Sequence, residues 1–335
     1  MIEKPEFHPD FEPSKVGVLL VNLGTPDAPT PAAVRRYLAE FLSDKRVVEL
    51  PALLWKPILH GIVLRTRPRK SAKAYQKVWT EAGSPLAVHT KKQAELLQQR
   101  FGDAAVVKHA MRYGRPGIGY RIQQMHDMGC ERILLAPLYP QYCGATTATV
   151  VDEAGRQLAD MRWQPALRTL PPYHDDPAHI DALAASVGAS LAALDFEPQI
   201  VIASFHGMPR RTLELGDPYH CQCQKTARLV GEKLGRQLFV AFQSRFGSAK
   251  WLEPATTDLL KALPERDIRK VAVFAPGFSA DCLETLEEMA IAGREQFLEA
   301  GGTDFAYLPC LNSSEEGMAM LEALVRRELG GWIAG

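Results

Sequence analysis

Four apolar segments that end abruptly at glycine or proline constrain the fold of this chain more than any other feature. They are VGVLLVNLGTP (16–26), ERILLAPLYP (131–140), PQIVIASFHGMP (198–209) and RKVAVFAPGF (269–278). Each is hydrophobic without alternation, which is typical of strands buried on both faces of a parallel sheet. A weaker run, DAAVVKHAMRYG (103–114), fits the same pattern. The sequence therefore predicts parallel strands that turn sharply at their carboxyl ends.

Stretches with helical periodicity lie between these strands, at residues 30–44, 90–102, 179–194 and 224–239. Strands and helices in this alternation indicate βαβ units and an α/β architecture. The first and third strands also resemble each other, VLLVNLGTP against VIASFHGMP, which suggests two similar halves. We therefore expect two Rossmann-like domains with parallel sheets and a cleft where the carboxyl ends of their strands meet.

The seam between the two domains is expected near Pro137–Pro140. We assign residues 15–138 and a C-terminal helix within 312–335, packed back on the first half, to domain I, and residues 139–311 to domain II. One segment breaks the pattern: PALLWKPILHGIVL (51–64) is nearly all apolar and is followed by RTRPRK (65–70). One interpretation is a core helix with a solvated basic end. The other is an apolar flap, which either covers an apolar ligand or rests on an anionic membrane.

Composition excludes several classes of function. The 39 basic and 39 acidic residues cancel, so no nucleic-acid partner is expected. Neither a dinucleotide-binding fingerprint nor a P-loop follows a strand. The first fifteen residues, MIEKPEFHPDFEPSK, hold no apolar signal-peptide core, and no apolar run approaches the roughly 20 residues of a membrane span. We expect a cytoplasmic protein with reduced thiols.

His206 is the strongest single candidate for chemistry. It falls at the carboxyl end of a predicted buried strand, where open α/β sheets bind their ligands. Gly207 would let the backbone turn beside it. A neutral imidazole can accept a proton or a metal near neutral pH. The alternative is a histidine that only bonds a loop carbonyl.

A second candidate is the acidic stretch GFSADCLETLEEM (277–289), which follows another strand end. Asp281, Glu284 and Glu288 lie at i, i+3 and i+7, so on an α-helix they would share one face. Neighbouring carboxylates in a cleft attract cations and relay protons. The alternative is structural, because Asp281 and Glu284 also have the spacing of a helix N-cap and its reciprocal partner.

The C-x-C pair Cys221 and Cys223 is a weak metal candidate. Pro218 in the preceding GDPY turn is expected to start a helix, and side chains two apart on a helix diverge. The other cysteines, Cys130, Cys143, Cys282 and Cys310, are scattered singly along the chain. A four-cysteine cluster is therefore not predicted.

The stretch SFHGMPRRTLELGDPY (204–219) closely resembles the signature of ferrochelatases. Further matches follow in order along the chain: LLVNLGTP (19–26), GSPL (83–86), MRYG (111–114), YPQY (139–142), FQSRFG (242–247), WLEP (251–254) and FSADCLETLEEM (278–289). The resemblance covers residues 16 to 312. It implies two Rossmann-like domains around a porphyrin cleft, and an enzyme that inserts ferrous iron into protoporphyrin IX to form protohaem with release of two protons.

The resemblance also implies roles for individual residues. His206, Asp281, Glu284 and Glu288 match the catalytic positions, with His206 and Glu284 meeting iron transiently. The cleft-lining positions match Leu23, Arg112, Tyr113, Tyr142, Trp251 and Phe278. Whether His206 takes a proton or binds the metal is left open, as is a second route that brings iron from the opposite face near Leu23, Arg112 and Tyr113. Residues 51–64 fall where the family has its cleft lip.

Departures from the family pattern refine these expectations. Cys282 stands where many relatives have a second histidine, which weakens a two-histidine metal path. No cysteine follows Cys310, so no [2Fe–2S] cluster is expected and no cofactor is required. Leu23 stands where relatives that use coproporphyrin often have tyrosine, which favours protoporphyrin IX. Expected partners are this porphyrin and Fe²⁺, with peripheral contact to a membrane or to a porphyrin-delivering enzyme as a further option.

Two other functions fit part of the pattern. One is a chelatase for another metal or tetrapyrrole, such as a cobalt enzyme, whose more carboxylated substrate would call for a more basic cleft. The other is a non-catalytic porphyrin or haem carrier. A carrier needs the apolar cleft but not His206 opposed to three carboxylates.

Overall fold

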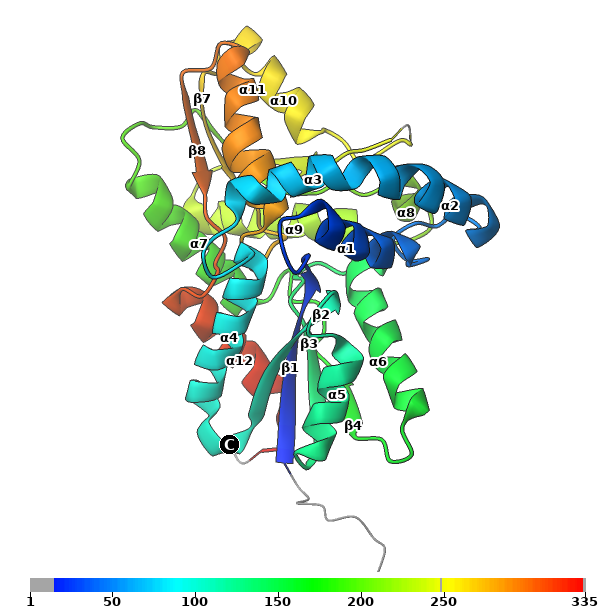
Figure 1. Cartoon of the computed structure of the whole chain (residues 1–335). Helices are drawn as coiled ribbons and strands as arrows, with labels where there is room; N and C mark the ends of the chain where they lie inside the picture. Colours follow the sequence, from blue (N-terminus) through cyan, green and yellow to red (C-terminus); the bar gives the residue numbers. More distant parts are fainter. Residues whose placement is uncertain (1–14, 248, 334–335) are drawn as a thin grey trace, which may run out of the picture.

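A computed structural model describes residues 15–247 and 249–333 of the chain and shows two four-stranded parallel sheets (Figure 1). The polar stretch at residues 1–14, where no signal peptide is expected, lies outside the described residues. The first sheet has the order β2-β1-β3-β4 and the second the order β6-β5-β7-β8. The strands are β1 (Lys15–Gly24), β2 (Val106–Tyr113), β3 (Cys130–Pro137), β4 (Ala166–Thr169), β5 (Ile200–His206), β6 (Leu238–Gln243), β7 (Lys270–Phe274) and β8 (Asp304–Leu308).

The apolar runs form the strands predicted for them. Strands β2, β5 and β7 fall within predicted segments, and β1 and β3 begin one residue before theirs; β1 and β5 are buried along almost their whole length. The two α/β domains with parallel sheets are therefore confirmed. Because β1 and β5 hold the same position in sheets of identical order, the resemblance between their sequences has a structural counterpart.

Three strands were not predicted: β4, β6 and β8. β4 has only four residues, and β6, at the edge of its sheet, was assigned to the end of a helix over 224–239. The helix instead ends at Leu234, because Gly235 adopts a left-handed conformation there. β4 pairs with β3, so the first sheet extends beyond the predicted boundary at residue 138.

Helices cover both faces of each sheet (Figure 1). They are α1 (Pro31–Ser43), α2 (Ala52–Ile58), η1 (Leu59–Val63), α3 (Leu64–Val78), α4 (Pro85–Phe101), η2 (Gly102–Ala104), α5 (Ile118–Asp127), η3 (Gly144–Ala148), α6 (Thr149–Asp160), α7 (Pro177–Ala192), α8 (Arg210–Glu214), α9 (Tyr219–Leu234), α10 (Thr256–Ala262), η4 (Pro264–Arg266), η5 (Glu284–Gly293), α11 (Arg294–Glu299) and α12 (Glu315–Glu328). The terminal helix α12 packs on α4 and β3 of the first half, and on α7. One apolar core cluster includes residues of both sheets, which joins the two domains.

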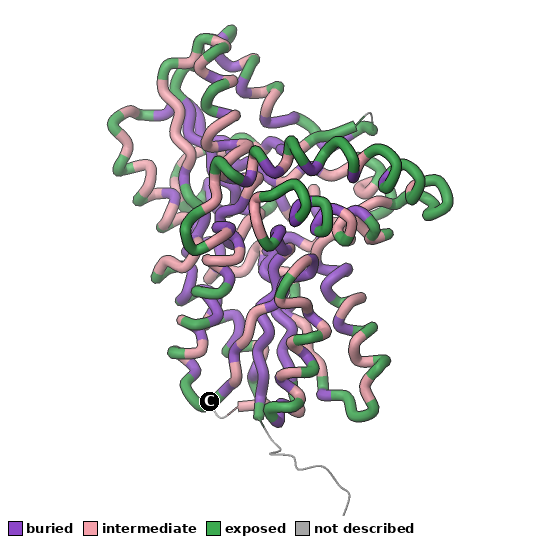
Figure 2. The backbone as a smooth tube through the Cα atoms, viewed as in Figure 1, coloured by how far each residue is buried: buried purple, intermediate pink, exposed green. Residues whose placement is uncertain are grey.

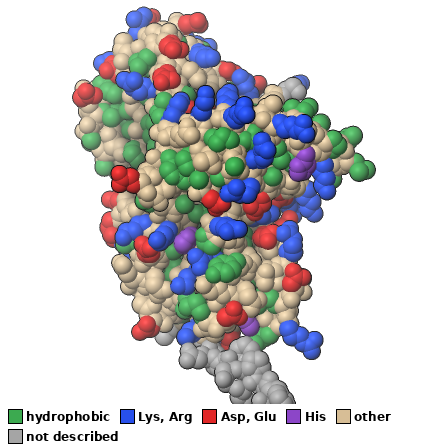
Figure 3. Space-filling model, viewed as in Figure 1, with side chains coloured by type: hydrophobic (Ala, Val, Ile, Leu, Met, Phe, Trp, Pro, Cys, Tyr) green, Lys and Arg blue, Asp and Glu red, His purple; other side chains and the backbone are tan. Residues whose placement is uncertain are grey.

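The apolar segment 51–64 is not a core helix. In α2 no residue is buried, and Leu53 is 90% exposed (Figure 2). Together with η1 and the start of α3 it projects from the junction of the domains, with apolar side chains at its tip and Lys and Arg along α3 (Figure 3). We call residues 51–70 the lip. No helix in the described part of the chain is long and apolar enough to cross a bilayer.

Candidate active site

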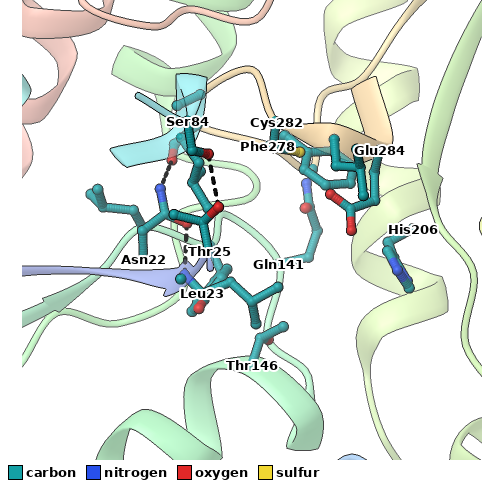
Figure 4. Close-up of a pocket in the computed structure, with 18 of the residues that line it drawn as sticks. Asn22, Leu23, Thr25, Ser84, Gln141, Thr146, His206, Phe278, Cys282 and Glu284 are labelled. Carbon is teal, nitrogen blue, oxygen red and sulfur yellow. Dashed lines mark hydrogen bonds between the residues drawn. The ribbon is translucent and has the colours of Figure 1, made fainter. Parts of the chain in front are cut away.

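A cavity lies between the carboxyl ends of the two central strands of each sheet (Figure 4). Its walls come from Asn22–Thr25 at the end of β1, from the segment after β3, from His206 at the end of β5 and from Gly277–Ala280 after β7. In this conformation the cavity measures about 80 Å³. This is well below the roughly 300–1,000 Å³ of a typical small-molecule site.

His206 reaches the cavity from the last position of β5, as predicted. Its Nδ1 lies 2.7 Å from the carbonyl oxygen of Gly207, and because a carbonyl only accepts, Nδ1 carries the proton. In a neutral ring this leaves Nε2 with a lone pair that can take a proton or a metal. The His206 ring also packs near Phe278, with centroids 6.4 Å apart.

Glycine is required directly after His206. A Cβ atom on Gly207 would lie 2.5 Å from the carbonyl oxygen of Gln243 at the end of β6. The Gly207 N–H donates to that same oxygen at 2.7 Å, which fastens the end of β5 to β6. Gly24, the last residue of β1, has a similar role: its φ is +111° and a Cβ would overlap the carbonyl of Tyr113. Both central strands therefore end by close backbone contact with an edge strand.

Glu284 lies next to His206 on the wall of the cavity (Figure 4). Glu288 lies one turn further along η5, a π-helix, and accepts hydrogen bonds from the Ser244 N–H at 2.6 Å and from Ser244 Oγ at 2.5 Å. Burial raises the pKa of Glu288, whereas the Ser244 bonds and His206 oppose this rise and Glu284 adds to it. His206, Glu284 and Glu288 thus form one electrostatically linked group that runs from the cavity toward Ser244.

Asp281 does not share a helix face with the two glutamates, which corrects the expectation from sequence. It lies before η5, is 4% exposed and does not line the cavity. Its carboxylate accepts hydrogen bonds from Thr285 Oγ1 at 2.9 Å, Tyr307 Oη at 2.8 Å and Asn312 Nδ2 at 2.6 Å. The N-cap hypothesis is also incomplete, because the Asp281 N–H donates to Asn312 rather than to Glu284.

Two of the six predicted cleft residues, Leu23 and Phe278, line the cavity. Trp251 does not: it packs beneath Gly207, and its Nε1–H donates to the carbonyl of Phe246 at 3.0 Å. Tyr142 lies on the segment after β3, and its N–H donates to Gln222 Oε1 at 2.6 Å.

Arg112 and Tyr113 belong to a buried cluster at the end of β2. The Arg112 guanidinium lies 2.5 Å from Asp44 Oδ2 and also donates to Thr149, while Tyr113 Oη donates to the same Asp44 oxygen at 2.9 Å. Burial alone would raise the pKa of Asp44. The pKa is nevertheless lowered overall, by hydrogen bonds from Thr149, the Arg46 N–H and Tyr113 and by the charge of Arg112. Arg112 is 9% exposed and its charge is neutralised within the cluster.

Sequence reasoning missed four tyrosines that line the cavity: Tyr37, Tyr75, Tyr139 and Tyr219. They come from α1, α3, the segment after β3 and the start of α9. No spacing rule links residues so far apart. The only sequence signal was that Tyr139 and Tyr219 lie in YPQY and GDPY.

The GDPY turn joins the segment after β3 to the start of α9. Asp217 accepts hydrogen bonds from the Gly144 N–H at 2.8 Å and from the Tyr219 N–H at 3.0 Å. The first bond holds the segment after β3, and the second holds the start of α9. Gln141 strengthens the same junction, because its Nε2 donates to Thr226 on α9 at 3.0 Å.

The cysteine pair of α9 is divided between solvent and core. Cys221 is exposed and Cys223 is fully buried, so the two thiols point apart as the helix geometry predicts. Within the described residues no group of three or more His, Cys, Asp or Glu is placed to hold a metal ion. Of the His, Cys, Asp and Glu residues in this described part, His206, Cys282 and Glu284 line the cavity.

Comparisons with known proteins agree with this arrangement. The ferrochelatase family model matches residues 15–329. Ferrochelatase of Rhizobium meliloti (strain 1021) is 56% identical, over 97% of this chain and 98% of its own, and that of Agrobacterium fabrum is 54% identical over 98% of both chains. Among solved structures, SirB from Bacillus subtilis with Fe³⁺ has a TM-score of 0.58 at 13% identity and covers 94% of this chain and 95% of its own. CbiX, described as the terminal enzyme for siroheme biosynthesis in denitrifying bacteria, has a TM-score of 0.51 at 12% identity and covers 93% of this chain and 98% of its own. The chain belongs to the ferrochelatase family.

Proposed function

We propose that the protein inserts Fe²⁺ into protoporphyrin IX, with release of two protons, as the terminal step of haem synthesis. Family membership supports the coarser statement that it is a metal chelatase acting on a porphyrin. The observation that carries the finer proposal is the pairing of His206 and Glu284 on one wall of an otherwise largely uncharged cavity.

The reaction requires the macrocycle to lose protons before it gains the metal. Two pyrrole N–H groups of a free-base porphyrin must give up their protons, and the metal must shed water. Within His206, Nε2 is the atom that can accept a pyrrole proton, because Nδ1 already donates to the carbonyl of Gly207. The same lone pair could instead receive the metal, and the position of His206 suits either role.

A route for protons or cations continues beyond His206. Because burial raises the pKa of Glu288, this carboxylate accepts a proton more readily than an exposed glutamate does. Its hydrogen bonds to Ser244 direct it away from the cavity, toward the loop after β6. We infer that Glu284 and Glu288 pass protons outward or draw Fe²⁺ inward along this line.

The porphyrin is larger than the cavity of about 80 Å³, so we infer that segments around the cavity move when the ring enters. Arg67 stacks over the ring of Phe246 at 5.1 Å, and Lys77 Nζ lies 2.8 Å from Glu287 Oε1. Both contacts join α3 of the first domain to segments of the second. They are exposed and therefore weak, which suits a closure that opens readily.

The choice of protoporphyrin IX rests on the apolar character of the site. Leu23 lies on the cavity wall, no Lys or Arg among the described residues lines it, and the tip of the lip carries Leu53 and Leu54, both exposed. A more carboxylated tetrapyrrole would leave its charges unpaired here. The exposed lip, with basic residues beside it, also supports peripheral contact with an anionic membrane or a porphyrin-delivering protein at a cytoplasmic location.

The test is anaerobic incubation of the purified protein with Fe²⁺ and protoporphyrin IX, followed by the loss of free-base fluorescence. We expect turnover with two protons released per iron inserted, and faster turnover than with coproporphyrin. Binding without turnover would identify a carrier instead. Turnover with Co²⁺ and a more carboxylated tetrapyrrole, but not with Fe²⁺ and protoporphyrin IX, would identify a different chelatase.

A further inference from the structure

Gln243, the last residue of β6, is a buried polar side chain close to the site but outside the cavity. It lies in the FQSRFG stretch (242–247), is 1% exposed and does not line the cavity. A buried amide costs free energy unless its donor and its acceptor are both bonded, and a leucine would fill a similar space without this cost. The hydrogen-bond partners of Gln243 therefore indicate why a glutamine stands here.

The side-chain amide of Gln243 joins β5 to the start of η5. Its Nε2 donates to the backbone carbonyl of Glu284, the first residue of η5, at 2.8 Å. Its Oε1 accepts from Ser204 Oγ on β5 at 2.8 Å. Because a carbonyl oxygen only accepts, the NH₂ group must face Glu284, which fixes the orientation of the amide. This position therefore needs a side chain with both a donor and an acceptor at its end.

The backbone of Gln243 is bonded to the segment that orients His206. Its carbonyl accepts from the Gly207 N–H at 2.7 Å, and the Gly207 carbonyl accepts from His206 Nδ1 at 2.7 Å. Gln243 is also the register partner of His206 across β5 and β6. One residue thus contacts the backbone beside His206 and the backbone from which the Glu284 side chain extends.

The start of η5 is a place where an external hydrogen bond has a large effect. π-Helical turns are rare and are found frequently at functional sites. η5 begins at Glu284, which lines the cavity. A donor on this first carbonyl fixes the position of the first turn, and with it the direction in which the Glu284 carboxylate points. The residue after Gln243, Ser244, holds Glu288 of the same helix. The end of β6 therefore holds η5 at two points.

We propose that Gln243 is a positioning residue for iron insertion, which keeps His206 and Glu284 in a fixed relative position by bonding the backbone beside each of them. This inference rests on the proposed function. Because Gln243 does not line the cavity, its substitution should lower kcat, for which the two groups must be aligned, and leave porphyrin binding largely unchanged.

The test compares Gln243→Leu with Gln199→Leu in anaerobic assays with Fe²⁺ and protoporphyrin IX, and in fluorescence titrations with the porphyrin. Gln243→Leu removes the side-chain bonds and keeps the backbone bond to Gly207. Gln199 is the matched control, because just before β5, at the opposite end of the strand, it donates to the Asp267 carbonyl at 3.0 Å and accepts from the Arg269 N–H at 2.6 Å.

Both leucine variants lose hydrogen bonds, so both should unfold at a lower urea concentration than the native protein. We expect kcat to fall at least tenfold in Gln243→Leu, with the Kd for protoporphyrin IX within about twofold of the native value. In Gln199→Leu, kcat should stay within about twofold of the native value, since this bond lies far from the cavity end of the sheet.

A conservative variant separates the donated bond from packing. In Gln243→Glu, a protonated carboxyl can donate to the Glu284 carbonyl with one oxygen and accept from Ser204 with the other. Burial and the neighbouring carboxylates of Glu284 and Glu288 favour this protonated form. At about pH 6 we therefore expect kcat of Gln243→Glu within about threefold of the native value.

Native kcat in Gln243→Leu would overturn the inference. So would an equal loss of kcat in both leucine variants, which would mean general damage to the sheet. A Gln243→Glu variant as slow as Gln243→Leu at about pH 6 would show that the donated bond is not the cause, and a rise in Kd that accounts for the whole loss would make Gln243 a binding residue instead. If the native protein inserts no Fe²⁺ into protoporphyrin IX, the proposed function falls together with this inference.

Discussion

Asp281 and Glu284 lie three residues apart in an acidic stretch, yet the structure predicts opposite consequences for their substitution. Asp281 is buried and its carboxylate receives three hydrogen bonds, from Thr285, Tyr307 and Asn312. Glu284 lines the cavity beside His206. Asp281→Ala should therefore act mainly on stability, and Glu284→Gln mainly on iron insertion.

The magnitude follows from the bonds that Asp281 holds. A hydrogen bond to a charged acceptor contributes about 1.5–3 kcal/mol, and contributions within one cluster are not additive. Asp281→Ala would also leave the buried hydroxyl of Thr285 and the amide of Asn312 without this acceptor. We expect a loss of about 4 kcal/mol in the free energy of unfolding, and a lower Tm by about 5 °C for a chain of this length.

Urea unfolding and anaerobic iron-insertion assays on the same preparations separate the two effects. Glu284→Gln should unfold within about 0.5 kcal/mol of the native protein, since its side chain faces the cavity, and should lose most turnover. The reasoning would be refuted if Asp281→Ala kept native stability but lost turnover. That result would assign Asp281 to the chemistry rather than to the anchoring of η5.

Three further predictions follow from the structure. Gly207→Ala should lower the free energy of unfolding by about 2 kcal/mol in urea and turnover by at least tenfold, because its Cβ would lie 2.5 Å from a backbone carbonyl of β6. The control is Gly155→Ala, where a Cβ meets nothing within 4 Å. Equal effects of the two substitutions would contradict the packing argument. His179 has its pKa lowered to about 3 by burial, so as pH falls below about 6.5 the unfolded chain takes up a proton that the folded chain does not, and stability falls. His179→Leu should therefore remove about 2 kcal/mol of the stability lost between pH 7 and pH 5 in urea unfolding, and an unchanged pH dependence would show that other groups cause the loss. Arg67→Ala, which removes the stacking on Phe246, should accelerate porphyrin binding in stopped-flow fluorescence, whereas a slower rate would mean that Arg67 guides the ligand instead.

The sequence was sufficient to predict the buried strands, because a strand covered on both faces needs a continuous apolar run. β1 and β5 show this, and they also carry the internal resemblance of the two halves. The edge strands β4, β6 and β8 do not have this signature. β6 alternates in burial at its start and follows a helix without a proline, so its residues were assigned to that helix.

Part of the candidate site was predictable because it lies at the ends of these buried strands. His206 marks the carboxyl end of a central strand, where α/β sheets bind ligands, and it lines the cavity. The grouping of Asp281 with the glutamates was wrong, because the spacing rule assumed an α-helix through residue 281, whereas the π-helix begins at Glu284. Gln243 could not be selected from sequence, since what distinguishes it is a pair of hydrogen bonds to Ser204 and Glu284, a property of the folded chain.

We expect His206 Nε2, beside Glu284 at the cavity, to receive a proton or the metal during iron insertion. The most direct test is a single anaerobic preparation of His206→Ala, assayed for protoporphyrin IX binding by fluorescence and for turnover with Fe²⁺. We expect binding within about threefold of the native protein and a loss of turnover of at least a hundredfold, typical of a removed acid–base group. Near-native turnover by His206→Ala would contradict this expectation.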